Sequence, residues 1–137
     1  MTEADEGEPR WLTRELVDAI HDAQIARHGG MLGVNDENLV ESALARPRNL
    51  FAYVGGDLAA LAAAYAFGLA KNHGYRDGNK RTAFLACYAF LGLNGLELVV
   101  PEPEAVVMML ALATDEVDEE GFARWARDHA VPYPAGG

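Results

Sequence analysis

Apolar residues recur every three or four positions along most of the chain, in segments that end at glycine, proline or asparagine. This spacing is typical of amphipathic helices. The first predicted helix covers residues 13–27 and is capped by Thr13, and the second is capped by Asn35. The second helix should stop before Pro47, because proline disfavours helix in the residue that precedes it. The apolar face of the first helix is expected to hold three residues: Leu16, Ile20 and Ala23.

Residues 48–56 break this pattern, because they are aromatic and β-branched and end in two glycines. They predict a short hairpin-like flap. The next helix, over residues 57–71, is alanine-rich and apolar on nearly every face, which predicts a buried central position. The remaining pattern predicts a helix over 79–93, an extended piece over 97–100, and helices over 104–113 and 119–129. The expected fold is all-α, with about six helices and one flap.

The length and the ends of the chain indicate one domain. A chain of 137 residues fits a single core, which we place at residues 11–130. Residues 1–10 are expected to be a flexible acidic tail and residues 131–137 a second flexible tail. The single cysteine, Cys87, lies in an apolar run and is interpreted as a buried, inert thiol.

The formal charge of −10 argues against nucleic-acid binding through a basic face, which needs clustered lysine and arginine. The absence of an apolar run of membrane-spanning length argues against a membrane protein, and the acidic N-terminus is unlike a secretory signal. We therefore expect a cytoplasmic location. Both lysines and two arginines nevertheless fall within residues 71–81, where Asp77 is the one acid. One concentrated positive patch on an acidic protein is suited to a small anion.

The candidate chemistry lies in residues 73–81, between the two most apolar predicted helices. A helix that begins at Asn79 presents unpaired N–H groups at the positive end of its dipole, and Gly78 allows a ligand to approach closely. Lys80 and Arg81 add charge for phosphate oxygens. Asp77 is suited to Mg²⁺ on a nucleotide. His73 could take a proton from an attacking hydroxyl.

Each of these residues also has an ordinary structural interpretation. His73 could be an unremarkable loop histidine, Asp77 a helix cap, and Lys80 and Arg81 solvated charges. Two cations at a helix N-terminus, however, are disfavoured by the dipole unless an anion binds there. This combination favours a ligand site over the structural interpretations.

The segment His73-Gly-Tyr-Arg-Asp-Gly-Asn-Lys-Arg81 resembles the Fic/Doc motif, His-x-Phe-x-Asp-Gly/Ala-Asn-x-Arg. Three further segments resemble Doc-family sequence in the same order: residues 28–30, 41–47 and 90–95. The resemblance covers residues 11–127 and implies the compact Fic/Doc helical fold. With lysine at position 80, the motif resembles that of the Doc (death-on-curing) branch, since adenylyl-transferring relatives usually have glycine at this position.

Two positions depart from the usual motif. Tyr75 replaces phenylalanine; its ring should still anchor the loop, and its hydroxyl then needs a partner. Gly74 stands where the family often has proline, and we expect it to make the loop more flexible.

The resemblance implies a role for each motif residue. His73, Asp77 and Arg81 would be catalytic, with His73 deprotonating the target hydroxyl and Asp77 holding Mg²⁺. Gly78, Asn79, Lys80 and Arg81 would bind the phosphates of ATP. The flap residues Phe51, Tyr53 and Val54 would dock the target by strand-like pairing, although Phe51 and Tyr53 could equally fill the core.

The resemblance also implies a reaction and its partners. Lys80 would crowd the usual nucleotide pose, so the γ-phosphoryl group would be transferred to a Ser or Thr hydroxyl. The implied target is translation elongation factor Tu, and translation would be arrested. The resemblance further implies a separate antitoxin of the Phd type, which would bind an apolar groove beside the site.

Three other functions remain open from the sequence. One is AMP transfer by the same fold, and another is a non-catalytic module that binds a nucleotide or an antitoxin. Intact His73 and Asp77 count against a pure binder. A helical metal phosphohydrolase would need clustered ligands, whereas His21, His28 and His129 are scattered and are expected to be solvated.

Overall fold

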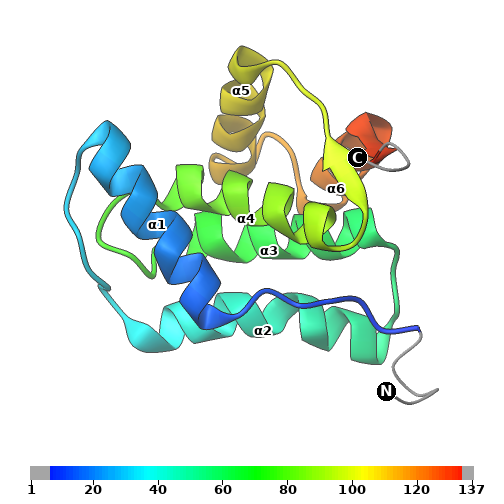
Figure 1. The fold of residues 1–137 in the computed structure, drawn as a ribbon, viewed down its shortest axis with the longest axis horizontal. Coiled ribbons are helices and arrows are strands. Elements are labelled where there is room, and N and C mark those ends of the chain that lie inside the picture. Colours follow the sequence, from blue (N-terminus) through cyan, green and yellow to red (C-terminus); the bar gives the residue numbers. More distant parts are fainter. Residues whose placement is uncertain (1–6, 134–137) are drawn as a thin grey trace.

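The computed structural model describes residues 7–133, which form six helices and two short strands (Figure 1). The elements, in chain order, are α1 (Arg14–His28), α2 (Glu37–Tyr53), α3 (Leu58–Asn72), α4 (Asn79–Leu93), β1 (Leu96–Leu98), α5 (Glu102–Ala113), α6 (Glu119–His129) and β2 (Ala130–Pro132). The predicted six-helix, mostly helical fold is confirmed. None of the helices among the described residues is long and apolar enough to cross a membrane.

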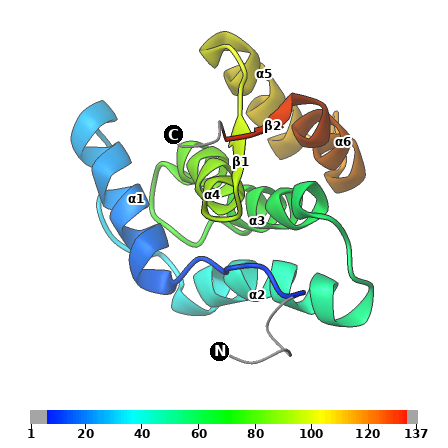
Figure 2. The same cartoon turned by 45° about the vertical axis from the view of Figure 1, so that its right-hand side comes forward.

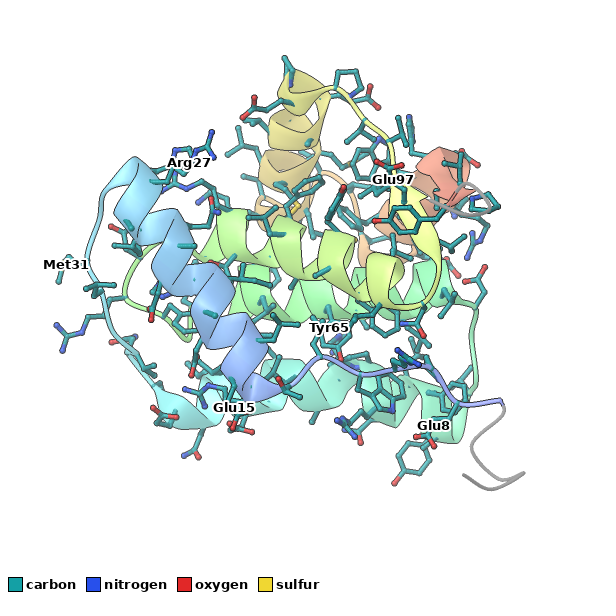
Figure 3. All side chains as sticks on the ribbon, viewed as in Figure 1. Glu8, Glu15, Arg27, Met31, Tyr65 and Glu97 are labelled. Atoms are coloured by element: carbon teal, nitrogen blue, oxygen red, sulfur yellow. The ribbon has the colours of Figure 1, made fainter. Side chains whose placement is uncertain are left out.

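Helix α3 is the centre of the molecule, as predicted. Ten of its residues are buried, among them Tyr65, whose hydroxyl accepts a hydrogen bond from Leu12 N at 3.0 Å. Helices α3 and α4 run side by side in opposite directions, with α2 along one side of the pair and α1 crossing it (Figures 1 and 2). Figure 3 shows Tyr65 in the middle of this packing. The alanine side chains of α3 are short, so the neighbouring helices can approach it on several sides.

Helix α1 begins where predicted, because Thr13 Oγ1 accepts a hydrogen bond from Leu16 N. Its predicted buried face was wrong. The buried residues are Val17, His21 and Ile25, whereas Leu16 is 37% exposed. The sequence shows apolar residues on both faces of this helix, and only the packing against α4 decides which face is buried.

The predicted end of α2 and the predicted hairpin-like flap were also wrong. Helix α2 continues through Pro47 to Tyr53, so most of residues 48–56 are helical. Pro47 is fully buried, and this burial offsets the hydrogen bond that its missing N–H removes from the helix. Phe51 packs edge-on against the ring of Trp11, with centroids 5.8 Å apart. The cap of α2 is Asp36 and not Asn35.

The C-terminal elements close the fold through a two-stranded antiparallel sheet. Strand β1 pairs with β2 in the register Leu96 to Pro132, Glu97 to Val131 and Leu98 to Ala130. Val131 and Pro132, which we expected to belong to a flexible tail, are therefore part of the folded domain. Residues 1–6 and 134–137 of the expected tails lie outside the described residues. Helix α6 is joined to the start of α3 by the ion pair of Arg127 with Asp57, the N-cap of α3.

Candidate functional site

Residues 73–78 form the loop between α3 and α4, which we call the motif loop. His73 ends α3 in the left-handed conformation, with φ 55°, and its side chain is exposed. Gly78 caps α4 with φ 72°, a conformation that glycine adopts at no steric cost. The loop therefore reverses the chain between two residues in left-handed geometry. His73 lies at one end of the turn and the start of α4 at the other.

Tyr75 anchors the motif loop in the core, as its ring predicted. The residue is 3% exposed, and its hydroxyl donates a hydrogen bond to Asp18 Oδ1 of α1 at 2.6 Å. Burial, together with this bond to a carboxylate, raises the pKa of Tyr75 well above its usual range. The Tyr75 hydroxyl, which a phenylalanine would lack, therefore has the hydrogen-bond partner that burial requires, namely Asp18.

Asn79 shapes the loop through its side-chain amide. Its Oδ1 accepts a hydrogen bond from Tyr75 N at 3.1 Å, and its Nδ2 donates to Tyr75 O at 2.9 Å. These two bonds join Asn79 to Tyr75 and so hold the segment between them, residues 75–79, in a closed turn. The amide is therefore engaged within the protein, and what Asn79 offers a ligand directly is its main-chain N–H in the first turn of α4.

Gly74 is tightly packed, contrary to the expected flexibility. A Cβ at this position would lie 2.5 Å from Val40 Cγ2 and 2.9 Å from Val40 N. Its carbonyl accepts hydrogen bonds from Asn35 N at 2.8 Å and Asp36 N at 3.1 Å. Glycine is present because the first turn of α2 passes too close for any side chain.

Asp77 is the acid of the site, and it is exposed and locally constrained. Its Oδ1 accepts a hydrogen bond from Gly78 N at 2.9 Å, and its Oδ2 accepts one from Met31 N at 3.2 Å. Each carboxylate oxygen keeps a second lone pair for a cation. Among residues 7–133 no group of three or more His, Cys, Asp or Glu could hold a metal by itself. One carboxylate beside an anion site suits Mg²⁺ that arrives with a nucleotide.

The N-terminus of α4 has the features of an anion site. Helices α4 and α5 have no side-chain cap, whereas side-chain oxygens cap the other four helices: Thr13, Asp36, Asp57 and Asp118. Lys80 and Arg81 are exposed in its first turn and, within residues 7–133, neither forms an ion pair. Lys71, in contrast, pairs with Asp115 at 2.7 Å and does not contribute to this patch. Two free cations beside uncapped N–H groups favour a bound anion.

The segment next to the motif loop is residues 29–34, which we call the strap and which our sequence interpretation missed. Val34 pairs with Tyr75 as an antiparallel bridge, and Gly33 O accepts a hydrogen bond from Arg76 N at 3.1 Å. Gly30 has φ 120°, which strains any other residue, and a Cβ there would lie 2.7 Å from Asp77 Oδ2, so glycine is favoured on both counts. Three glycines within five residues were the available signal. Figure 3 shows Met31 on the outer side of the strap, 57% exposed.

The residues proposed as a flap lie elsewhere. Helix α2 starts beside the motif loop and runs away from it for 17 residues, which corresponds to about 25 Å. Phe51 is half-buried against Trp11 as a core residue, and Tyr53 and Val54 are exposed at the far end of the helix (Figure 1). The structure therefore does not bring these three residues together with His73 and Asp77.

An apolar groove of about 480 Å³ adjoins the site. Lys80 and Arg81 line one end of it, beside His28 and Gln24 at the end of α1. Its apolar walls come from α4, β1 and α5: Phe84, Leu85, Tyr88, Leu98, Met109 and Leu110. A larger cleft of about 890 Å³ lies between α2 and α6 and includes none of the motif residues. We assign the candidate site to the smaller groove and the motif loop, because the motif residues Lys80 and Arg81 line that groove.

Comparison with known proteins agrees with this geometry. Residues 11–91, more than half of the chain, match the sequence model of the Fic/DOC family. The chain is 34% identical over 115 residues to the protein kinase doc of Escherichia phage P1, covering 83% of this chain and 90% of that protein. It is 38% identical over 99 residues to the toxin Doc of Mycolicibacterium smegmatis, covering 69% and 76% of the two chains. The protein belongs to the Fic/Doc family.

Proposed function

We propose that this protein is a Doc-like toxin that transfers the γ-phosphoryl group of ATP to a Ser or Thr hydroxyl of another protein. The observation that carries the proposal is the start of α4, which has no side-chain cap. Its exposed Lys80 and Arg81 form no ion pair within residues 7–133, and it follows the loop that holds exposed His73 and Asp77. A relative of similar length named as a protein kinase supports the same reaction class. Phosphoryl transfer requires mainly a phosphate cradle, a metal carboxylate and a group that handles the proton of the nucleophile.

In this proposal each residue of the site has a role. Main-chain N–H groups of Asn79–Arg81 and the side chains of Lys80 and Arg81 bind phosphate oxygens, whereas the Gly78 N–H is held by Asp77 Oδ1 and Gly78 serves by leaving room for the ligand. Asp77 holds Mg²⁺, which neutralises charge on the phosphates when it is bound. His73 takes the proton of the attacking hydroxyl. Its imidazole is a suitable base, and its side chain is exposed, so a target hydroxyl can reach it.

Lys80 favours γ-phosphoryl over adenylyl transfer. AMP-transferring members of the Fic/Doc family usually carry glycine at this position. A long cationic side chain there would occupy space that the nucleotide needs in its usual orientation. With ATP bound in the reversed direction, the γ-phosphate would be next to the nucleophile. AMP transfer is the alternative, and it would place the α-phosphorus there.

We propose the strap, in place of residues 51–54, as the element that docks the protein target. It is non-helical, it borders Asp77, and Met31 and Leu32 are 57% and 62% exposed on it. A non-helical segment can pair with a target peptide through its main chain, while exposed apolar side chains supply contact area. Elongation factor Tu is the target that the resemblance implies, with arrest of translation as the consequence.

A separate antitoxin is the partner that we propose for the apolar groove. The groove has apolar walls and ends at Lys80 and Arg81, so an amphipathic helix with an acidic residue at that end would bury its apolar face and block the phosphate site. Replacing Leu110, which is 48% exposed on the groove, by glutamate should weaken binding of the cognate antitoxin by at least tenfold.

Calorimetric titration of the antitoxin into the two proteins would measure this change. Val54→Glu is the matched control, because Val54 is an exposed valine at the far end of α2, outside the groove, and this variant should bind as the wild type does. Equal affinity of the Leu110→Glu variant and the wild type would contradict the proposed groove.

The reaction is tested with ATP labelled at either the γ- or the α-phosphorus. The purified protein is incubated with each label, Mg²⁺ and a bacterial lysate, with EDTA as the control. We expect the γ label alone to reach a protein of the size of elongation factor Tu, and EDTA to abolish the transfer. Transfer of the α label would replace the proposal by AMP transfer. ATP binding without transfer of either label would favour a non-catalytic binding module.

A further inference from the structure

A buried histidine of α1 lies inside the motif loop. His21 is 1% exposed, and its Nε2 is 2.8 Å from the main-chain oxygen of Asp77. Its ring is stacked on that of Tyr75, with centroids 4.0 Å apart and an interplanar angle of 12°. A Cβ on Gly78 would lie 3.9 Å from His21 Cδ2. The loop therefore closes around this ring, which we had expected to be solvated.

The bond to Asp77 fixes one particular peptide plane. A carbonyl oxygen can only accept, so His21 Nε2 carries the hydrogen. The peptide that follows Asp77 is planar, so holding its oxygen also holds the N–H of Gly78 on the opposite side. That N–H donates to Asp77 Oδ1 at 2.9 Å. The hydrogen bond from His21 to one edge of this peptide thus helps to orient the Asp77 carboxylate, which accepts from the N–H on the opposite edge.

We propose that His21 is a positioning residue, which sets the Asp77–Gly78 peptide plane and thereby aims the Asp77 carboxylate and the start of α4. The functional part of this inference rests on the proposed phosphotransfer, whereas the orientation of the loop does not. A histidine that only fills space would matter through its ring. A positioning histidine matters through one N–H.

Two variants separate these roles. His21→Phe keeps an aromatic ring against Tyr75 and the burial of the site, but removes the donor. His21→Gln removes the ring and places an amide N–H the same number of bonds from Cα, so it should restore the bond to Asp77 O. Phe122→Leu, a fully buried change in α6, is the control for loss of stability alone.

The first measurement is amide hydrogen exchange of the folded proteins, which requires no activity. The N–H groups of Arg76 and Gly78 are held inside the motif loop, and we expect them to exchange at least tenfold faster in His21→Phe than in Phe122→Leu. His21→Gln should return most of this protection. Equal exchange in His21→Phe and Phe122→Leu would overturn the inference, whatever reaction the protein catalyses.

The second measurement is the rate of label transfer by the same four proteins. We expect kcat to fall about 10- to 100-fold in His21→Phe, to recover in His21→Gln and to stay near the wild-type value in Phe122→Leu. A wild type that transfers no label would remove the proposed function and leave the exchange result to decide the role of His21. A wild-type kcat in His21→Phe would show that the bond does not serve the reaction.

Discussion

Replacing His73 by asparagine is expected to lower the rate of phosphoryl transfer by a factor of about 10² to 10⁴, the usual contribution of a positioned general base. Asparagine is preferred to alanine because His73 adopts φ 55°, and asparagine tolerates the left-handed conformation better than alanine does. Among the described residues, the His73 side chain makes no hydrogen bond that the substitution would break. The rate is measured by transfer of the γ label.

The control for this variant is His129→Asn, which changes a histidine of α6 that contacts Trp125 and Glu104 far along the chain from the motif loop. It should retain the wild-type rate. Nucleotide binding, measured by calorimetry, should be unchanged in His73→Asn, because the phosphate-binding groups of α4 remain. A His73→Asn protein that transfers label at the wild-type rate would exclude the histidine as the base.

The parts of this fold that follow local rules could be predicted from the sequence. Thr13 caps α1 where its side chain predicts a cap, and α4 begins and ends at the expected residues. The resemblance also placed the candidate site in residues 73–81, and the structure brings His73, Asp77 and the start of α4 into one loop. The helix boundaries follow from hydrogen bonds between residues close in sequence, and the position of the site follows from the motif.

The parts that depend on distant packing could not be predicted. Pro47 lies inside a helix because the free energy gained by its burial outweighs the cost of the lost main-chain hydrogen bond. The neighbouring residues in the sequence do not indicate that Pro47 is buried. The strap becomes part of the site through contacts with residues more than forty positions later, such as the pairing of Val34 with Tyr75 and the bond of Met31 N to Asp77 Oδ2. His21 was placed on the wrong face of α1 because the loop that surrounds it folds from residues more than fifty positions away.

Gly74 shows the energetic consequence of such packing. Gly74→Ala is expected to destabilise the protein by about 1–3 kcal/mol, the usual cost of an added methyl group in a tight site. The new Cβ would lie 2.5 Å from Val40 Cγ2 and 2.9 Å from Val40 N, and the second atom belongs to the backbone of α2. Relief requires the loop to move, which would stretch the bonds from Asn35 N and Asp36 N to Gly74 O. Urea unfolding measures the change.

A double-mutant cycle attributes this cost to the contact with α2. Val40→Ala removes Cγ2 but leaves the backbone atom, so Gly74→Ala should cost less in the Val40→Ala background than in the wild type, although still more than nothing. Gly92→Ala is the matched control, because that glycine lies within α4 and its Cβ would meet only the end of the Tyr133 side chain at 3.3 Å. Alanine should be neutral there or stabilise the helix by up to about 1 kcal/mol. Strictly additive free energies for Gly74→Ala and Val40→Ala would mean that the close approach of the motif loop to α2 is not what requires glycine at position 74.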